Sequence, residues 1–356
     1  MTKGPSSPDP RNRTVPAGRR LLAAKGAYLL LSLGAAFVVL EAGLRLAGPG
    51  VGPLNSSALY YDNPRGYYEL VAMDGARPVY GLRYNSDRRG FRLPDGSVGG
   101  GGAGEAGRVG IVMLGDSFTF GRGVRYADTC AARLEKLLAA EGGGLTVFNA
   151  GVVGVGAEEV ERVYLEAGRA KKPRLAVYGF VLNDFGLDLP GGRPASDLID
   201  GNNAPPSAGL RKYSAVVDRF AGALERRGGT RATVKAYREA FSGAEAGKKF
   251  AVLRRLNAEV KADGGRLVIM LYPLLYSLRD YPFREAHAAL REFCAAEGIP
   301  FLDLLPAFAV HGERKLWAAS SDQHPNELAQ EIAAGALAAF LKERGLIPGA
   351  GKKAGG

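Results

Sequence analysis

The stretch VGIVMLGDSFTFG at residues 109–121 joins an apolar run to a serine in a glycine-bounded turn. Residues 109–114 carry no charge or polar side chain, which is typical of a β-strand buried on both faces of a parallel sheet. Gly115 permits a tight turn, and Ser117 follows it by two residues. A serine at a strand end is well placed for nucleophilic attack, although a purely structural turn serine gives the same local pattern.

Outward from this stretch, apolar runs alternate with helical patterns along the chain. We expect strands at 109–114, 145–148, 174–181, 266–271 and 301–304, and helices at 128–140, 158–170, 283–296 and 327–341. This alternation predicts an α/β fold, a doubly wound, flavodoxin-like parallel sheet of five strands in a three-layer α/β/α arrangement. In such folds the functional groups lie beyond the carboxyl ends of the strands.

Glycines and polar side chains that could bind or activate a substrate follow the second and third predicted strands and precede the last predicted helix. The second strand is followed by the segment 149–156, the third by Asn183 and Asp184, and the last helix is preceded by His324. Each has a structural explanation on its own, as a turn or helix cap, but together they predict one site. The glycine order in 151–156 is GxxGxG, which does not match the dinucleotide fingerprint GxGxxG. The other two histidines, His287 and His311, are expected at the surface.

Together these blocks resemble the SGNH, or GDSL-type, hydrolase family over residues 109–341. The resemblance implies that Ser117 is the nucleophile, His324 the base and Asp322 the acid of a catalytic triad. It also implies an oxyanion hole formed by the Ser117 and Gly154 N–H groups and the Asn183 amide. Supporting residues near the nucleophile and the amide are Gly115, Asp116 and Asp184.

Two positions depart from the commonest family pattern. Val181 stands where the family usually has glycine, and the aspartate lies two residues before His324 instead of three, where Ser321 stands. The sequence DQHPN at 322–326 is similar to a variant in membrane-anchored members. If Asp322 faces away, a Ser–His dyad remains.

The N-terminal segment has the composition of a membrane span. Residues 26–40 are uncharged, and with their flanks they reach the roughly 20 residues that a crossing needs. All basic residues of the tail precede this core, so we expect a cytoplasmic N-terminus and an extracytoplasmic body, periplasmic or extracellular. A cleaved signal peptide is the alternative, although no convincing small-x-small cleavage site follows Leu40.

These features divide the chain into five expected parts. They are a cytoplasmic basic tail at 1–25, a single-pass anchor at 26–48, a lead-in segment packed on the domain at 50–108, the hydrolase domain at 109–345 and a flexible tail at 346–356. The lead-in expectation rests on the resemblance of residues 81–92 to the region before the first block in anchored members. Residues 96–107 are expected to form a glycine-rich flexible loop. Residues 185–249 are expected to form a helical insertion without strands, with basic helices around 211–227 and 230–241, either a lid or a surface helix pair.

Charge and cysteine content limit the partners and cofactors. The net charge is +11, but residues 1–25 hold +5 and residues 342–356 hold +3, which argues against a nucleic-acid partner. The two cysteines, Cys130 and Cys294, have no ligand spacing and are expected to be buried free thiols. We expect no metal and no organic cofactor.

The resemblance and the expected location imply acyl transfer chemistry outside the cytoplasm. The favoured function is a serine esterase acting on acyl groups, above all O-acetyl groups, of polysaccharide, peptidoglycan or lipid. An O-acyltransferase using the same acyl-enzyme is one alternative. A non-catalytic binding or assembly protein of the same fold is another.

Overall fold

The computed structural model describes one N-terminal helix and most of the body. The described residues are 17–46, 60–62, 68–70, 77–79, 82–86, 92–94, 110–140, 145–186, 188–189, 193–194, 214, 216, 234–319 and 322–347. The chain divides into two compact units, one comprising 1–50 with 206–225, the other 51–205 with 226–356. The predicted helix at 211–227 (apart from residues 214 and 216), the glycine-rich loop at 96–107 and the end of the tail lie outside the described residues.

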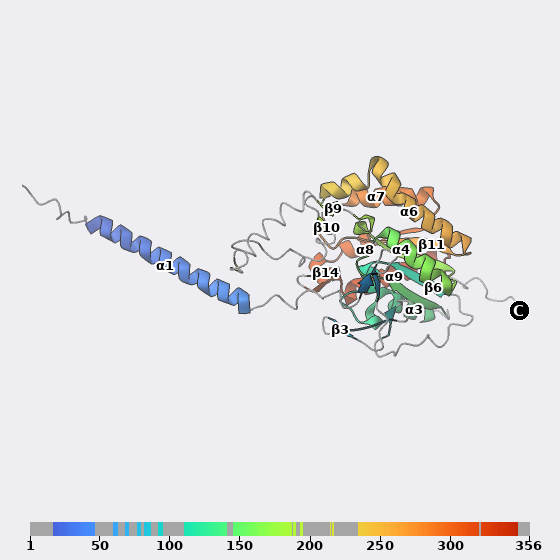
Figure 1. Ribbon diagram of the computed structural model, residues 1–356, viewed down its shortest axis with the longest axis horizontal. Helices are drawn as coiled ribbons and strands as arrows, with labels where there is room; N and C mark the ends of the chain where they lie inside the picture. The colour runs from blue at the N-terminus through green and yellow to red at the C-terminus, as the bar shows by residue number, and fades with distance from the viewer. Residues whose placement is uncertain are drawn as a thin grey trace, which may run out of the picture. The chain divides into compact units, whose positions relative to one another are not determined.

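The larger unit is built around a five-stranded parallel sheet (Figure 1). Its strands are β6 (Gly110–Gly115), β7 (Thr146–Gly151), β8 (Leu175–Val181), β11 (Arg266–Tyr272) and β12 (Phe301–Asp303). The order β12-β11-β8-β6-β7 confirms the predicted flavodoxin-like sheet. The chain adds β7 on one side of β6 and then β8 on the other, so the strand order reverses at β6, and the crevice that usually holds the site opens where the Ser117 strand ends.

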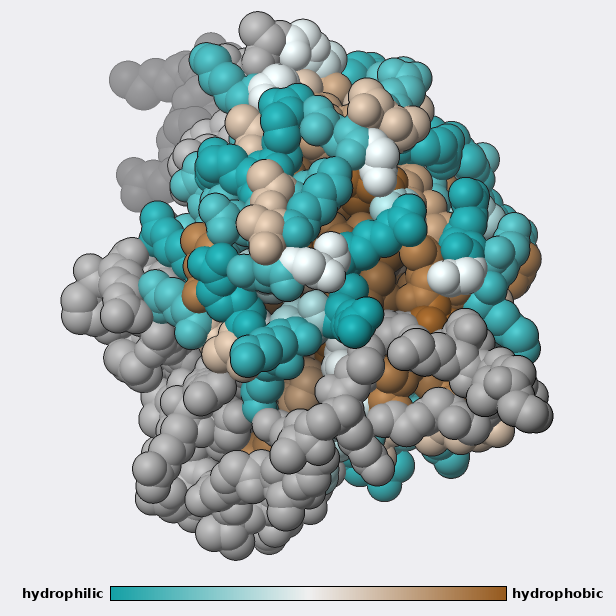
Figure 2. Space-filling model, turned by 90° about the vertical axis from the view of Figure 1, so that its right-hand side faces the viewer, coloured by the Kyte–Doolittle hydropathy of each residue, from teal (hydrophilic) through white to brown (hydrophobic). Residues whose placement is uncertain are grey.

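Helices cover both faces of this sheet. Figure 1 shows α3 (Cys130–Ala140) and α9 (Glu327–Glu343) on one side and α4 (Ala157–Val163), α6 (Gly243–Ala262) and α7 (Arg284–Ala296) on the other. β6 and β8 are buried along their whole length, as their continuous apolar runs require. Figure 2 shows hydrophilic side chains spread over one face, with hydrophobic ones visible between them.

Short antiparallel pairings occur outside the central sheet. The lead-in contains the pair β1 (Tyr60–Asp62) and β2 (Tyr68–Leu70) and the sheet β3 (Arg77–Val79), β4 (Leu82–Ser86) and β5 (Arg92–Leu93). Near the C-terminus β13 (Trp317–Ala319) pairs with β14 (Asp322–Pro325), after the short helix α8 (Leu305–Ala309).

Three expectations were wrong in detail. The interval 185–249 does contain strands, β9 (Asp188–Leu189) and β10 (Arg193–Pro194), because two-residue strands leave no periodic signal. A helix that we did not predict, α6, also begins within this interval, and Phe241 from the same interval stacks on Phe185. His287 is only 2% exposed, because its ring bonds Asp303 and Tyr281 beneath the loop that follows β11.

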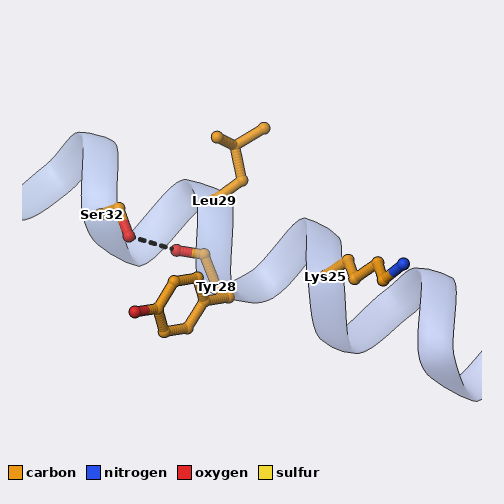
Figure 3. A pocket seen from close by; sticks show the side chains of 4 residues that line it. All are labelled: Lys25, Tyr28, Leu29 and Ser32. Atoms are coloured by element: carbon orange, nitrogen blue, oxygen red, sulfur yellow. Dashed lines mark hydrogen bonds between the residues drawn. The ribbon is translucent and has the colours of Figure 1, made fainter.

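The smaller unit contains α1 (Ala17–Leu46), whose segment Lys25–Gly43 is long and apolar enough to cross a membrane. A membrane anchor and a signal sequence share these properties. Large apolar side chains of this helix are exposed, and Figure 3 shows Leu29 and Tyr28 projecting from it, with Ser32 Oγ donating to the Tyr28 carbonyl at 2.9 Å. Near its end the Glu41 carboxylate accepts hydrogen bonds from Ser214 Oγ at 2.9 Å and from the backbone N–H of residue 216 at 3.0 Å.

Candidate active site

Ser117 is the first residue of a single helical turn at the end of β6. This turn is α2 (Ser117–Phe120), and the Asp116 carboxylate caps it by accepting the Phe118 N–H at 2.8 Å. Ser117 is 6% exposed. The predicted nucleophile therefore lies at a strand-to-helix junction on the carboxyl edge of the sheet.

A row of glycines lets α2 lie across the strand ends. Gly151, Gly115 and Gly179 stand side by side on β7, β6 and β8. A Cβ on Gly151 would lie 2.2 Å from the Phe120 backbone nitrogen, and one on Gly115 or Gly179 would lie 2.3 Å from Thr119 Oγ1. At Gly151 the clash is with helix backbone, so no larger residue fits there without moving α2, whereas at Gly179 it is with the Thr119 side chain. We did not predict a role for Gly179, whose signal was a glycine inside an otherwise apolar strand.

The β13–β14 hairpin brings His324 to Ser117. His324 Nε2 lies 2.9 Å from Ser117 Oγ, and His324 Nδ1 lies 2.5 Å from Asp322 Oδ1. Residues two apart in a strand point to the same face, so the two-residue spacing in β14 places both side chains together. Asp322 Oδ1 also accepts the His324 backbone N–H at 3.0 Å.

The electrostatics of Asp322 suit an ionised partner for the imidazole. Burial raises the pKa of Asp322, but the hydrogen bonds and charge of His324 and the charge of Arg122 outweigh burial. The net pKa lies well below the ordinary value of 3.8. When the carboxylate accepts a hydrogen bond from Nδ1–H, the proton stays on Nδ1 and the Nε2 lone pair is directed at Ser117 Oγ.

Residues that the motifs did not assign hold this hairpin and α2 in place. Asn326 caps α9 by accepting the Ala329 N–H at 3.1 Å, and its amide donates to the Lys315 carbonyl at 2.8 Å. Gln330 donates to the Phe118 carbonyl at 2.9 Å. The Asn149 amide donates to the Thr119 carbonyl, also at 2.9 Å, from the β7 side.

The predicted oxyanion donors flank Ser117 in the sheet. Gly154 lies in the turn after β7 with φ of +81°, and a Cβ there would meet no atom within 4 Å. Asn183 lies in the 3-10 turn Leu182–Phe185 after β8, and its buried Oδ1 has no hydrogen-bond partner among the described residues. Because β6 lies between β7 and β8, the segments that carry the three predicted donors follow neighbouring strands at the carboxyl edge of the sheet.

Asp184 anchors the turn that carries Asn183. Its Oδ2 accepts the Val181 N–H at 3.0 Å, and the side chain is buried. Burial, followed by the nearby charge of Asp116, raises the pKa of Asp184 well above its ordinary value of 3.8. Burial and the neighbouring carboxylate therefore both favour the protonated form of Asp184.

Among the residues that the structure describes, no three His, Cys, Asp or Glu side chains cluster as metal ligands. Cys130 and Cys294 are both buried, and neither forms a disulfide. Burial raises the pKa of each thiol to about 12, so neither is a reactive thiolate at neutral pH.

Residues 113–332 match the GDSL-like Lipase/Acylhydrolase family, and this match covers more than half of the 356 residues. The chain belongs to this hydrolase family. No curated protein matches it.

Among solved structures, the chain is similar to TesA, at 17% identity over 66% of this chain and 98% of TesA, with a TM-score of 0.42. It is similar to a lipase/acylhydrolase from Enterococcus faecalis, at 19% identity over 66% of this chain and 96% of that one, with a TM-score of 0.41. It is also similar to the acetyl xylan esterase AlAXEase, at 11% identity over 64% and 98%, with a TM-score of 0.41.

Proposed function

We propose that the protein is a serine esterase whose nucleophile is Ser117. The observation that carries the proposal is the relay from Ser117 Oγ to His324 Nε2 at 2.9 Å and from His324 Nδ1 to Asp322 at 2.5 Å. A nucleophile within hydrogen-bond reach of a base, which a carboxylate orients, is the arrangement that acyl transfer through an acyl-enzyme needs.

In the first half-reaction, Ser117 Oγ attacks the ester carbonyl carbon while His324 Nε2 takes its proton. The Ser117 and Gly154 N–H groups and the Asn183 amide stabilise the negative charge on the carbonyl oxygen. His324 then gives the proton to the departing alkoxide, which leaves an acyl group on Ser117.

In the second half-reaction, His324 removes a proton from water, and the hydroxide attacks the acyl-enzyme carbonyl. Collapse of this second tetrahedral intermediate returns the proton to Ser117 and releases the acid. Asp322 stabilises the imidazolium in both halves, and no step requires a metal or an organic cofactor.

We further propose that the substrates are acyl esters of envelope polysaccharide, peptidoglycan or lipid, with O-acetyl groups favoured. This part rests on α1, whose exposed apolar surface suits a membrane anchor with the body outside the cytoplasm. Fold alone names no substrate, so the test is release of acetate from acetylated polysaccharide beside hydrolysis of p-nitrophenyl acetate.

An O-acyltransferase is a second candidate, favoured by one observation. Ser117 is 6% and His324 1% exposed, and limited access of water to an acyl-enzyme is what a transferase needs. The test supplies an acyl donor together with a sugar acceptor. Acetylated acceptor without free acetate favours the transferase, and free acetate alone favours the esterase.

A further inference from the structure

Arg92 is a buried cation that lies before the region matched by the family. It belongs to β5, is 2% exposed and ranks among the largest fully buried side chains of the described residues. The family match begins only at residue 113. Burial of an arginine is costly unless its guanidinium is well paired, so its contacts indicate what the position is for.

The guanidinium is directed at the end of the nucleophile helix. Nη1 donates to the carbonyls of Phe120 at 2.5 Å and Gly121 at 2.7 Å, and Nη2 donates to that of Val124 at 2.6 Å. Carbonyls at a helix C-terminus carry partial negative charge, and bonds to a cation are stronger than neutral ones. The guanidinium carbon also lies 4.5 Å from the Tyr84 ring centroid and 4.7 Å from that of Phe120.

Tyr84 holds the same turn from β4. Its hydroxyl accepts the Gly123 N–H at 2.9 Å, and its side chain is 1% exposed. Two lead-in side chains therefore fix the backbone at 120–124.

This turn is bonded directly to Ser117. The N–H groups of Gly121 and Arg122 both donate to the Ser117 carbonyl at 3.1 Å. A single helical turn does not hold its shape alone, so the position of α2 depends on such contacts. A shift at Gly121 would be passed to the Ser117 backbone and its hydroxyl.

We propose that Arg92 is a positioning residue for the Ser117 nucleophile, and that the lead-in strands β4 and β5 are a functional part of the catalytic domain. The inference rests on the proposed function. Arg92 touches no reacting atom and acts only through the turn at 120–124.

The experiment uses the full chain in detergent and compares Arg92→Met, Arg92→Lys and Tyr84→Phe with the wild type. The matched control is Arg125→Met, which removes an arginine that is 65% exposed and paired with Asp128. The readouts are kcat and KM for p-nitrophenyl acetate, the rate of Ser117 labelling by a fluorophosphonate, and the thermal unfolding midpoint. Ser117→Ala gives the background.

We expect Arg92→Met to lower kcat and the labelling rate by about 10- to 100-fold, with KM nearly unchanged, because a small displacement of a nucleophile has that effect. Arg92→Lys should not restore the rate, since an ammonium lacks the planar fork that reaches several carbonyls. Arg125→Met should match the wild type.

Wild-type kcat and labelling in both Arg92 variants would overturn the inference while leaving the proposed function intact. If Arg92→Met does not fold, Tyr84→Phe decides: a several-fold loss of kcat with an unchanged KM supports the inference, and an unchanged kcat overturns it. A wild type no more active than Ser117→Ala would instead contradict the proposed function, and this inference with it.

Discussion

At the scale of single residues, Asp322 shows how a shifted motif still forms a relay. In a strand, a two-residue spacing turns two side chains to one face, and the Asp322 carboxylate bonds His324 Nδ1 directly. Asp322→Asn removes the charge and offers the imidazole an amide in its place. We expect kcat for p-nitrophenyl acetate to fall on the order of 10³-fold or more, because the imidazolium loses its counter-charge and its tautomer is no longer fixed. A kcat within a few-fold of wild type would indicate a Ser–His dyad.

Asp184 gives a stability prediction that depends on pH. Its pKa is raised in the folded protein by burial and by Asp116, so the unfolded chain ionises first as pH rises. The folded state therefore loses stability between the ordinary pKa of 3.8 and its own raised pKa. Asp184→Asn keeps an acceptor for the Val181 N–H and removes this loss. The unfolding midpoint of Asp184→Asn should rise relative to that of the wild type as the pH increases above 3.8, and a constant difference would contradict the raised pKa.

Asp322 should show the opposite sign. Its folded pKa is depressed, so its contribution to stability is present above the ordinary value of 3.8 and is lost as pH falls through that value toward the folded pKa. Asp322→Asn should therefore be less stable than the wild type at neutral pH, with the gap closing below about pH 4. A gap that widens on acidification would argue against the depressed pKa.

The candidate site residues that follow strands can be predicted from the sequence more readily than the residues that hold them in position. Ser117 and Asn183 each follow an apolar run, which marks a strand end in any sequence of this class. Gln330 bonds the Phe118 carbonyl and Arg92 bonds that of Phe120, and neither pairing has a local pattern, since the first spans 212 residues. His287 was misplaced for the same reason, because its partner Asp303 lies on another element.

At the scale of elements, the glycine row makes a steric prediction. Gly151→Ala would place a Cβ 2.2 Å from the Phe120 backbone nitrogen, and backbone cannot rotate away as a side chain can. We expect α2 to shift, with a loss of about 1–3 kcal/mol in unfolding free energy and a loss of esterase activity. Denaturant unfolding measures the change in unfolding free energy, and kcat for p-nitrophenyl acetate measures the change in activity.

Gly335→Ala is the matched control for this substitution. Gly335 lies in α9, and a Cβ there would meet no atom within 4 Å. The variant should gain about 0.5–1 kcal/mol, because alanine loses less backbone entropy than glycine in a helix. Equal effects of the two substitutions would contradict the steric explanation.

The long elements were predictable and the short ones were not. The three central strands β11, β8 and β6 have continuous apolar runs, and the alternation of strands with helices predicts a parallel sheet. β9 and β10 have two residues each, too few for any period. α6 was missed because its first two turns contain two glycines and two lysines, as a loop does, although Phe250, Leu253 and Leu256 have helical spacing and are buried.

For the whole molecule, the open question is whether α1 is retained as a membrane anchor or removed as a signal sequence. A retained anchor predicts that the full chain stays in membranes after carbonate extraction and that its intact mass includes residues 1–25. Because both native thiols are buried, single-cysteine variants report topology. Gly356→Cys should react with an impermeant maleimide in intact cells, and Ser7→Cys only after permeabilisation. A mature mass lacking the first 40 or more residues would favour a signal peptide.

The central claim is that Ser117 is the nucleophile of an ester hydrolase. The most direct test is hydrolysis of p-nitrophenyl acetate by the purified full chain beside Ser117→Ala, with both proteins checked for the same unfolding midpoint. We expect turnover by the wild type and a loss of several orders of magnitude in Ser117→Ala, whose remaining activity comes from binding and the oxyanion hole alone. Equal turnover by the two proteins would contradict the claim.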